Sequence, residues 1–96
     1  MIEFHYGQLV RCECTFSTSD VSVDPDDVYF AFRAPGDAAT TTYHYGVDDE
    51  IVKTDTGDYY VDLDASTAGR WQYRWYSTGS GQAGVYREFR VLDAQI

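Results

Sequence analysis

The sequence is poor in positive charge and has no long hydrophobic run. Seven Lys and Arg residues stand against sixteen Asp and Glu residues, which leaves a net charge of −9 at pH 7. A surface this acidic repels phosphate backbones and anionic headgroups, so binding to nucleic acid or to a membrane surface is disfavoured. No stretch of about 18 apolar residues is present, so no transmembrane helix is expected. The acidity indicates solubility or, alternatively, a basic partner or bound cations.

Cysteine is also scarce, and the first residues do not have the pattern of a secretion signal. Residues 1–6 lack the basic start and apolar run of a signal peptide, so we expect the protein to be made and folded in a cytoplasm. Cys12 and Cys14 are the only cysteines. Alternate residues on a strand point the same way about 6.5 to 7 Å apart, too far for an easy disulfide. We therefore expect two free, buried thiols.

Aromatic residues are plentiful by contrast, with nine Tyr, five Phe and two Trp in 96 residues. A chain of this length has room for one domain, which we expect to span 1–96 with a core at about 8–92. Hydrophobic and polar residues alternate with a period of two, and turn residues interrupt the pattern about every ten positions. The pattern predicts strands at 8–17, 28–33, 40–45, 51–54, 59–63, 71–76 and 85–91. This predicts an all-β, antiparallel immunoglobulin-like sandwich of about seven strands.

The alternation also assigns a face to each side chain. The predicted inward set is Val10, Cys12, Cys14, Phe16, Val28, Phe30, Phe32, Tyr59, Val61, Leu63, Trp71, Tyr73, Trp75, Phe89 and Val91. Outward aromatics are the candidates for function, because Tyr and Arg are enriched where proteins meet. The predicted protein-contact residues are Tyr29, Tyr60, Arg74, Tyr76 and Tyr86, and we expect Tyr60, Arg74, Tyr76 and Tyr86 to lie on one contact face. The alternative is that these rings only stabilise the sheet as cross-strand pairs.

The sequence offers little for catalysis or for a cofactor. His5 and His44 are the only histidines, and His5 lies in an N-terminus expected to be frayed. A Cys12–Cys14 pair with both histidines lacks the usual spacing of a zinc site. Calcium remains open at two acidic loops, 24–27 and 48–50, although neither has EF-hand spacing. The glycine-rich segment 78–84 has no lysine and predicts a hairpin tip, not a phosphate loop. We expect no enzyme activity, no cofactor and no metal.

Four segments together resemble a family of short immunoglobulin-like proteins encoded in tailed-phage and prophage genomes. They are residues 28–36 (VYFAFRAPG), 43–46 (YHYG), 51–59 (IVKTDTGDY) and 68–75 (AGRWQYRW). The resemblance implies a non-enzymatic virion component that binds a capsid, a portal or neck, or a tail in many symmetric copies. It carries over no catalytic residues. Cys12 and Cys14 are not part of the family pattern and bear only on whether a metal is present.

Two other functions stay open from the sequence. An immunoglobulin-like module on a phage particle would also suit binding to carbohydrate or to a host surface, and exposed tryptophan would favour that reading. Trp71 and Trp75, on a strand expected to be central, are predicted to be core residues instead. An enzyme or a regulator of host defence is the third alternative, because a fold does not fix a function. Nothing in the sequence supplies a site for it.

Overall fold

The computed structural model describes residues 2–79 and 84–93, which fold into strands joined by turns. The strands, in chain order, are β1 (Ile2–His5), β2 (Leu9–Thr15), β3 (Ser17–Thr18), β4 (Val21–Ser22), β5 (Asp27–Arg33), β6 (Thr41–His44), β7 (Val52–Asp55), β8 (Asp58–Asp64), β9 (Gly69–Thr78) and β10 (Gly84–Leu92). Within the described residues, no helix is long and apolar enough to cross a membrane.

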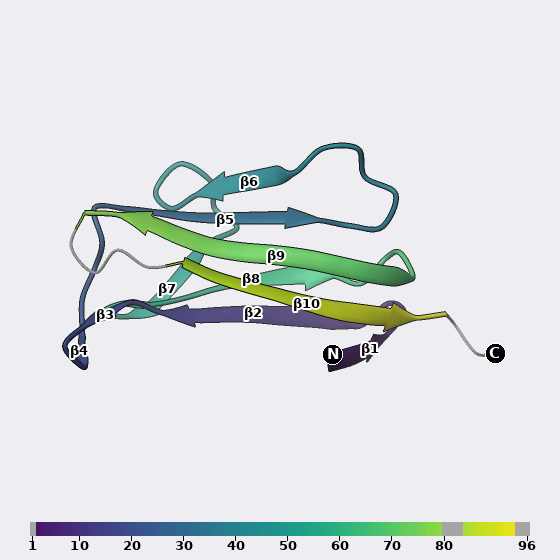
Figure 1. Ribbon diagram of the computed structural model, residues 1–96, viewed down its shortest axis with the longest axis horizontal. Helices are drawn as coiled ribbons and strands as arrows, with labels where there is room; N and C mark the ends of the chain where they lie inside the picture. The colour runs from purple at the N-terminus through teal and green to yellow at the C-terminus, as the bar shows by residue number, and fades with distance from the viewer. Residues whose placement is uncertain (1, 80–83, 94–96) are drawn as a thin grey trace.

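Two sheets pack face to face (Figure 1). Sheet A has five strands in the order β1-β10-β9-β5-β6, and sheet B has three in the order β2-β8-β7. Every pairing in them is antiparallel except that of β1 with β10. Two sheets with this crossed-over strand order form an immunoglobulin-like sandwich. The predicted fold class is confirmed, and each of the seven predicted strands has a counterpart.

The N-terminus is where the sequence-based expectation is wrong. Residues expected to be frayed form β1, which pairs in parallel with the end of β10 from Ile2 opposite Phe89 to His5 opposite Leu92. The ring of Phe4 packs edge-on against Phe89 at 5.5 Å between centroids. One apolar side chain and a ladder of backbone hydrogen bonds therefore order a segment that is too short to show alternation. The loop expected at 19–27 likewise contains β4, which pairs with β3.

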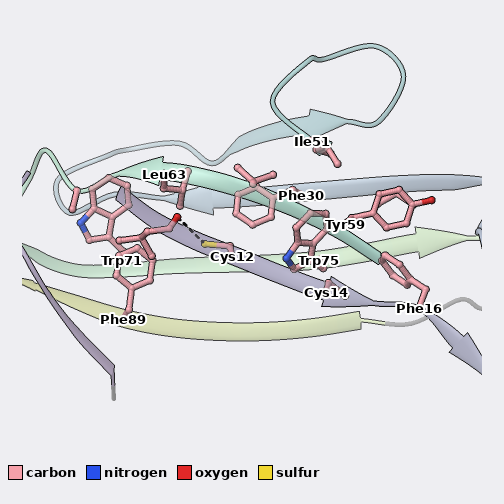
Figure 2. Packing of buried hydrophobic residues seen from close by; sticks show 14 of the residues in the cluster. Cys12, Cys14, Phe16, Phe30, Ile51, Tyr59, Leu63, Trp71, Trp75 and Phe89 are labelled. Carbon is pink, nitrogen blue, oxygen red and sulfur yellow. Dashed lines mark hydrogen bonds between the residues drawn. The ribbon is translucent and has the colours of Figure 1, made fainter. Parts of the chain in front are cut away.

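The core is a row of rings along the length of the sandwich (Figure 2). Phe30 on β5 and Trp75 on β9 are both fully buried, with their rings in T-shaped contact at 4.8 Å. Trp71 stacks on Phe89 at 5.6 Å. Every predicted inward residue is either buried or packed against this cluster. The predicted faces of the strands are thus confirmed.

The start of β9 shows how the two sheets are joined without a disulfide. In antibody-type domains, a tyrosine bonds back to the backbone here, and a cysteine two residues later is bridged to the other sheet. Trp71 takes the tyrosine's place, since its Nε1–H donates a 2.9 Å hydrogen bond to the carbonyl of Thr67. Tyr73 takes the place of the cysteine, and its hydroxyl interacts with the Cys12 thiol on β2. An aromatic side chain thus spans the interior where a disulfide would.

Asp24 ties the loop before β5 to the turn between β7 and β8. Lys53 Nζ donates a 2.7 Å hydrogen bond to one carboxylate oxygen of Asp24, while the backbone N–H of Gly57 donates a 2.8 Å bond to the other. The hydroxyl of Tyr59 also donates to Asp24, at 3.3 Å. Gly57 itself has φ = +77°, and a Cβ there would lie 2.6 Å from the carbonyl oxygen of Phe16. Only glycine fits this turn.

We predict that Gly57→Ala lowers the free energy of unfolding by about 3 kcal/mol or more, because left-handed strain adds to a backbone clash. Gly36→Ala is the matched control, since Gly36 has φ = +85° but a Cβ there meets nothing within 4 Å. It carries only the strain, about 1 to 2 kcal/mol. Urea unfolding followed by tryptophan fluorescence measures both. Equal losses in the two variants would show that the crowding at Gly57 is unimportant.

A second prediction concerns the stability of the fold at acid pH. The hydrogen bond from Lys53, followed by that from Gly57, holds the pKa of the Asp24 carboxyl below its usual range. Its contribution to stability is therefore present above the unfolded value of about 3.9 and is lost as pH falls toward the folded-state pKa. Asp24→Asn should be less stable at pH 7 and lose less on acidification than the wild type, measured as urea midpoints from about pH 6 to pH 2.5. Asp49→Asn, at an exposed turn, should keep the full acid-induced loss. A wild-type acid response in Asp24→Asn would contradict the prediction.

Candidate functional site

The outer face of sheet A carries a row of stacked rings. Tyr29 on β5 lies opposite His44 on β6 and opposite Tyr76 on β9. Its ring stacks on His44 at 4.5 Å and on Tyr76 at 4.9 Å between centroids. All three side chains are half-buried, so the row keeps part of its surface open to solvent.

Asp27 fixes the histidine end of this row. The Nε2 atom of His44 lies 3.0 Å from one carboxylate oxygen of Asp27, and the hydroxyl of Thr78 donates a 2.9 Å hydrogen bond to the other. The bonds from Thr78 and His44, in that order, hold the pKa of the Asp27 carboxyl below its usual range. The imidazole is thereby held against the ring of Tyr29 and has little freedom to turn.

Ala31 lies two residues from Tyr29 along β5, on the same face of the sheet. Beside it lie Arg74 on β9 and, next to Arg74, Tyr86 on β10. The guanidinium of Arg74 lies 4.5 Å from the centroid of the Tyr76 ring, within range for a cation–π contact. Ala31 carries only a methyl group between larger neighbours. The surface is therefore lower at Ala31 than at the arginine and tyrosine beside it.

A shallow depression of about 430 Å³ lies over this part of the sheet. Its walls include Arg33, Thr42, Arg74, Tyr76 and Tyr86. Guanidinium groups bind carboxylates with two parallel hydrogen bonds, and phenol rings offer flat apolar area with a polar tip. The lining is thus suited to hold a partner's side chains, and it offers no nucleophile paired with a base.

Positive charge is concentrated on this face, although the chain as a whole is acidic. Alternation along β5, β9 and β10 turns four of the seven Lys and Arg residues outward here: Arg33, Arg70, Arg74 and Arg90. Arg70 lies 3.4 Å from Glu88, which offsets part of this charge. The outer face of sheet A is therefore less acidic than the remaining surface of a chain with a net charge of −9.

Four of the five predicted contact residues meet on this face, and the fifth does not. Tyr29, Arg74, Tyr76 and Tyr86 form what we call the tyrosine–arginine face. Tyr60 lies on β8 in sheet B, where the guanidinium of Arg11 stacks 3.9 Å from its ring centroid. The expectation of one shared face is wrong for Tyr60, because period-two alternation gives the side of a strand but not the sheet to which it belongs. The stacking of Tyr29 on Tyr76 also fits the alternative of a stabilising cross-strand pair.

Three further residues complete the face, and the sequence pattern did not single them out. His44 joins the ring row, and Arg33 and Thr42 line the depression. Each lies outward by the same alternation that selected the tyrosines. The missing information was the register between β5, β6 and β9, which long-range contacts set and the sequence does not display.

The cysteines and histidines do not form a common site. Cys12 and Cys14 point into the interior from β2, whereas His44 lies on the outer face of sheet A and His5 on β1. Among the described residues, no group of three or more Cys, His, Asp or Glu side chains is placed to hold a metal ion. In the acidic loop 24–27, Asp24 and Asp27 are hydrogen-bonded to the protein's own groups. The predicted hairpin joins β9 to β10, but residues 80–83 of its tip lie outside the described residues.

Comparison with known proteins supports the immunoglobulin-like fold but does not indicate a function. No protein-family model and no curated protein sequence matches the chain. One similar solved structure is the extracellular domain of the voltage-gated sodium channel β4 subunit, described as a parallel homodimer that explains that protein's role in cell–cell adhesion. The TM-score is 0.55, with 15% sequence identity over 98% of this chain and 91% of the other. The resemblance to phage virion proteins stays a prediction.

The two thiols give a direct test of the packing around β2. Burial, followed by the charge of Asp62, raises the pKa of Cys12 to about 12, and burial raises that of Cys14 to about 11. At pH 8 only about one thiol in a thousand or fewer is then ionised in the folded protein. We predict that a disulfide reagent such as Ellman's labels both cysteines at least about a hundredfold more slowly in the native protein than in urea. Rapid native labelling would contradict the placement of β2.

Proposed function

We propose that this protein is a non-enzymatic docking module that binds another protein through the tyrosine–arginine face, as a structural component of a tailed-phage virion. The observation that carries the docking role is the gathering of Tyr29, Arg74, Tyr76 and Tyr86 on one exposed sheet face around a depression. Tyr and Arg are among the residues that contribute most to binding energy at protein interfaces.

The arrangement of these side chains favours affinity because it exists before any partner arrives. Tyr29 is held between His44 and Tyr76, and Arg74 lies over the Tyr76 ring. Side chains that are already ordered lose little rotamer entropy when a partner covers them. A face of this kind binds by exclusion of water from its rings and by hydrogen bonds from its guanidinium groups.

Charge indicates the chemistry of the partner surface. The whole chain, at −9, would favour a basic partner. The tyrosine–arginine face instead presents two lining arginines, Arg33 and Arg74. We therefore expect the patch that covers the depression to carry carboxylates, with any basic residues of the partner at its rim.

The virion context rests on the sequence resemblance of residues 28–36, 43–46, 51–59 and 68–75 to the phage family. A component repeated by the symmetry of a particle gains from avidity, so each face needs only modest affinity. The partner on the particle, whether capsid, portal, neck or tail, stays open. The sodium channel β4 domain serves cell–cell adhesion, which is a precedent for docking by this fold.

The carbohydrate-binding alternative lacks the feature that would have favoured it. Trp71 and Trp75 are 4% and 0% exposed, so neither offers a ring for a sugar to stack on. Tyrosine rings remain available in the depression. A glycan array with the purified chain discriminates the two functions, because strong signals there would favour the alternative.

The proposal predicts that the chain is present in purified particles of the phage or prophage that encodes it, as seen by mass spectrometry. The double variant Arg74→Glu with Tyr76→Ser should reduce its amount per particle more than tenfold, because two hot-spot side chains are lost. Tyr6→Ser, at an exposed turn outside the tyrosine–arginine face, is the matched control and should be incorporated like the wild type. Thermal unfolding of each purified variant verifies that it is folded.

Two results would count against the proposal, and they separate its parts. Absence of the chain from purified particles would end the virion role. Normal incorporation of the folded double variant would show that the chain docks through some other surface.

A further inference from the structure

Open strand edges are the second kind of binding surface on this molecule. The border strands of the two sheets are β1 and β6 in sheet A and β2 and β7 in sheet B. Three of them have the features by which proteins avoid edge-to-edge pairing. β1, β6 and β7 have four residues each, and β7 also has a register irregularity and carries Lys53.

β2 is longer and more regular than these three strands, although it carries the charged residues Arg11 and Glu13. It has seven residues, contains no proline and pairs with β8 without a register shift. Within residues 2–79 and 84–93, no strand is paired with its other side. β2 is therefore a long, straight and uncovered edge.

The ladder shows which backbone groups lie along that edge. Phe16 N–H donates to the carbonyl of Gly57 at 2.8 Å, and Ala65 N–H donates to the carbonyl of Gln8 at 3.0 Å. Hydrogen-bonded residues alternate along an antiparallel pair, so the even-numbered residues from 8 to 16 bond to the β8 side. The N–H and C=O groups of Leu9, Arg11, Glu13 and Thr15 consequently point away from β8, toward the open edge.

We propose that a second copy of this chain pairs with β2 along this edge, about a two-fold axis at Cys12. In that antiparallel register, Arg11 of each copy lies opposite Glu13 of the other copy. The dimer therefore contains two pairs of opposite charges. Positions 11 and 13 are among those whose backbone groups face the edge, so each charged pair is a hydrogen-bonded pair of the new ladder.

Other registers are worse for a simple electrostatic reason. A two-fold axis at Arg11 places two arginines directly opposite each other, and an axis at Glu13 places two glutamates opposite each other. Like charges directly opposite in a sheet are destabilising. The axis at Cys12 also gives the longest overlap, from Leu9 opposite Thr15 to Thr15 opposite Leu9. Charge complementarity and length thus select the same register.

Arg11 is already held in place for this contact. Its Nε and Nη2 atoms donate to the two oxygens of Asp62 at 2.9 and 3.1 Å, while its guanidinium lies over the ring of Tyr60. These bonds leave Nη1 for a further acceptor. The carboxylate of Glu13 from the second copy would be that acceptor.

The geometry has a consequence for docking. A two-fold axis that continues one antiparallel sheet into another runs perpendicular to that sheet, so it keeps the same face of both copies on the same side. Both tyrosine–arginine faces would therefore point in one direction, and the dimer would dock on one surface with two faces. The pairing itself uses only β2 and does not depend on the proposed docking function.

We expect the purified chain to be a dimer in sedimentation equilibrium under reducing conditions. The buffer should contain about 0.15 M salt, because this screens repulsion between the acidic chains beyond about 8 Å. Glu13→Arg places Arg11 opposite a new arginine twice, and Arg11→Glu places two glutamates opposite each other twice. Each single variant should weaken the dimer by roughly tenfold or more. Glu50→Arg, at an exposed turn, raises the net charge by the same amount as Glu13→Arg and should leave the dimer unchanged.

Mixing the two single variants distinguishes a loss of pairing from a loss of folding. Arg11→Glu and Glu13→Arg should each be weakened alone, yet an equimolar mixture should form a heterodimer, because both cross-strand pairs then join opposite charges. The double swap Arg11→Glu with Glu13→Arg should restore the homodimer. A wild-type chain that stays monomeric up to about 1 mM would overturn the proposal, as would a dimer that ignores these substitutions or single variants that fail to combine. Loss of the dimer with normal docking through Arg74 and Tyr76 would leave the proposed function standing.

Discussion

The contact between Phe30 and Trp75 is the interaction on which the rest of the structure depends. These two fully buried rings lie on β9, the central strand of sheet A, and on its neighbour β5. A 96-residue chain buries only about 60 to 65% of its unfolded surface, so each large ring is a substantial part of its stability. Because the side chains of a strand alternate, fixing these two rings inward also fixes Tyr29, Arg74 and Tyr76 outward. The core and the candidate site are thus two sides of the same register.

Aromatic packing joins the two sheets in an interior whose two cysteines are free. A bridge between the sheets would stabilise the fold by restricting the unfolded chain. Here Tyr73 extends from sheet A to the Cys12 thiol of sheet B, and Trp71 anchors the start of β9 to the carbonyl of Thr67. Packing and hydrogen bonds replace the covalent link. This solution requires well-fitted large side chains, which is consistent with a chain in which aromatics make up 17% of the residues.

Local patterns in the sequence were enough to predict the strands and their faces, but not the partners of the strands. Alternation placed Val10, Cys12 and Cys14 inward and Tyr86 outward, and all four lie as expected. The same rule could not separate Tyr60 from Tyr76, because they lie outward on different sheets. It also missed β1, whose order comes from parallel pairing with β10. The sequence shows on which side of a strand a residue lies, but it does not show which distant strand pairs with that strand.

The two outward surfaces of the sandwich differ in ways that suit the different roles proposed for them. On sheet A the charged groups surround rings and a depression, and Arg74 lies over the ring of Tyr76. On sheet B the charges lie along a border strand, and Arg11 is bound on both oxygens of Asp62. A wide, low face with ordered rings suits a folded partner surface, whereas a straight edge with alternating charge suits another strand. Since an edge pairing through β2 would turn two such faces toward one side, the narrow contact would multiply the strength of the broad one. A small domain with limited area for any single interface gains affinity in this way without enlarging either surface.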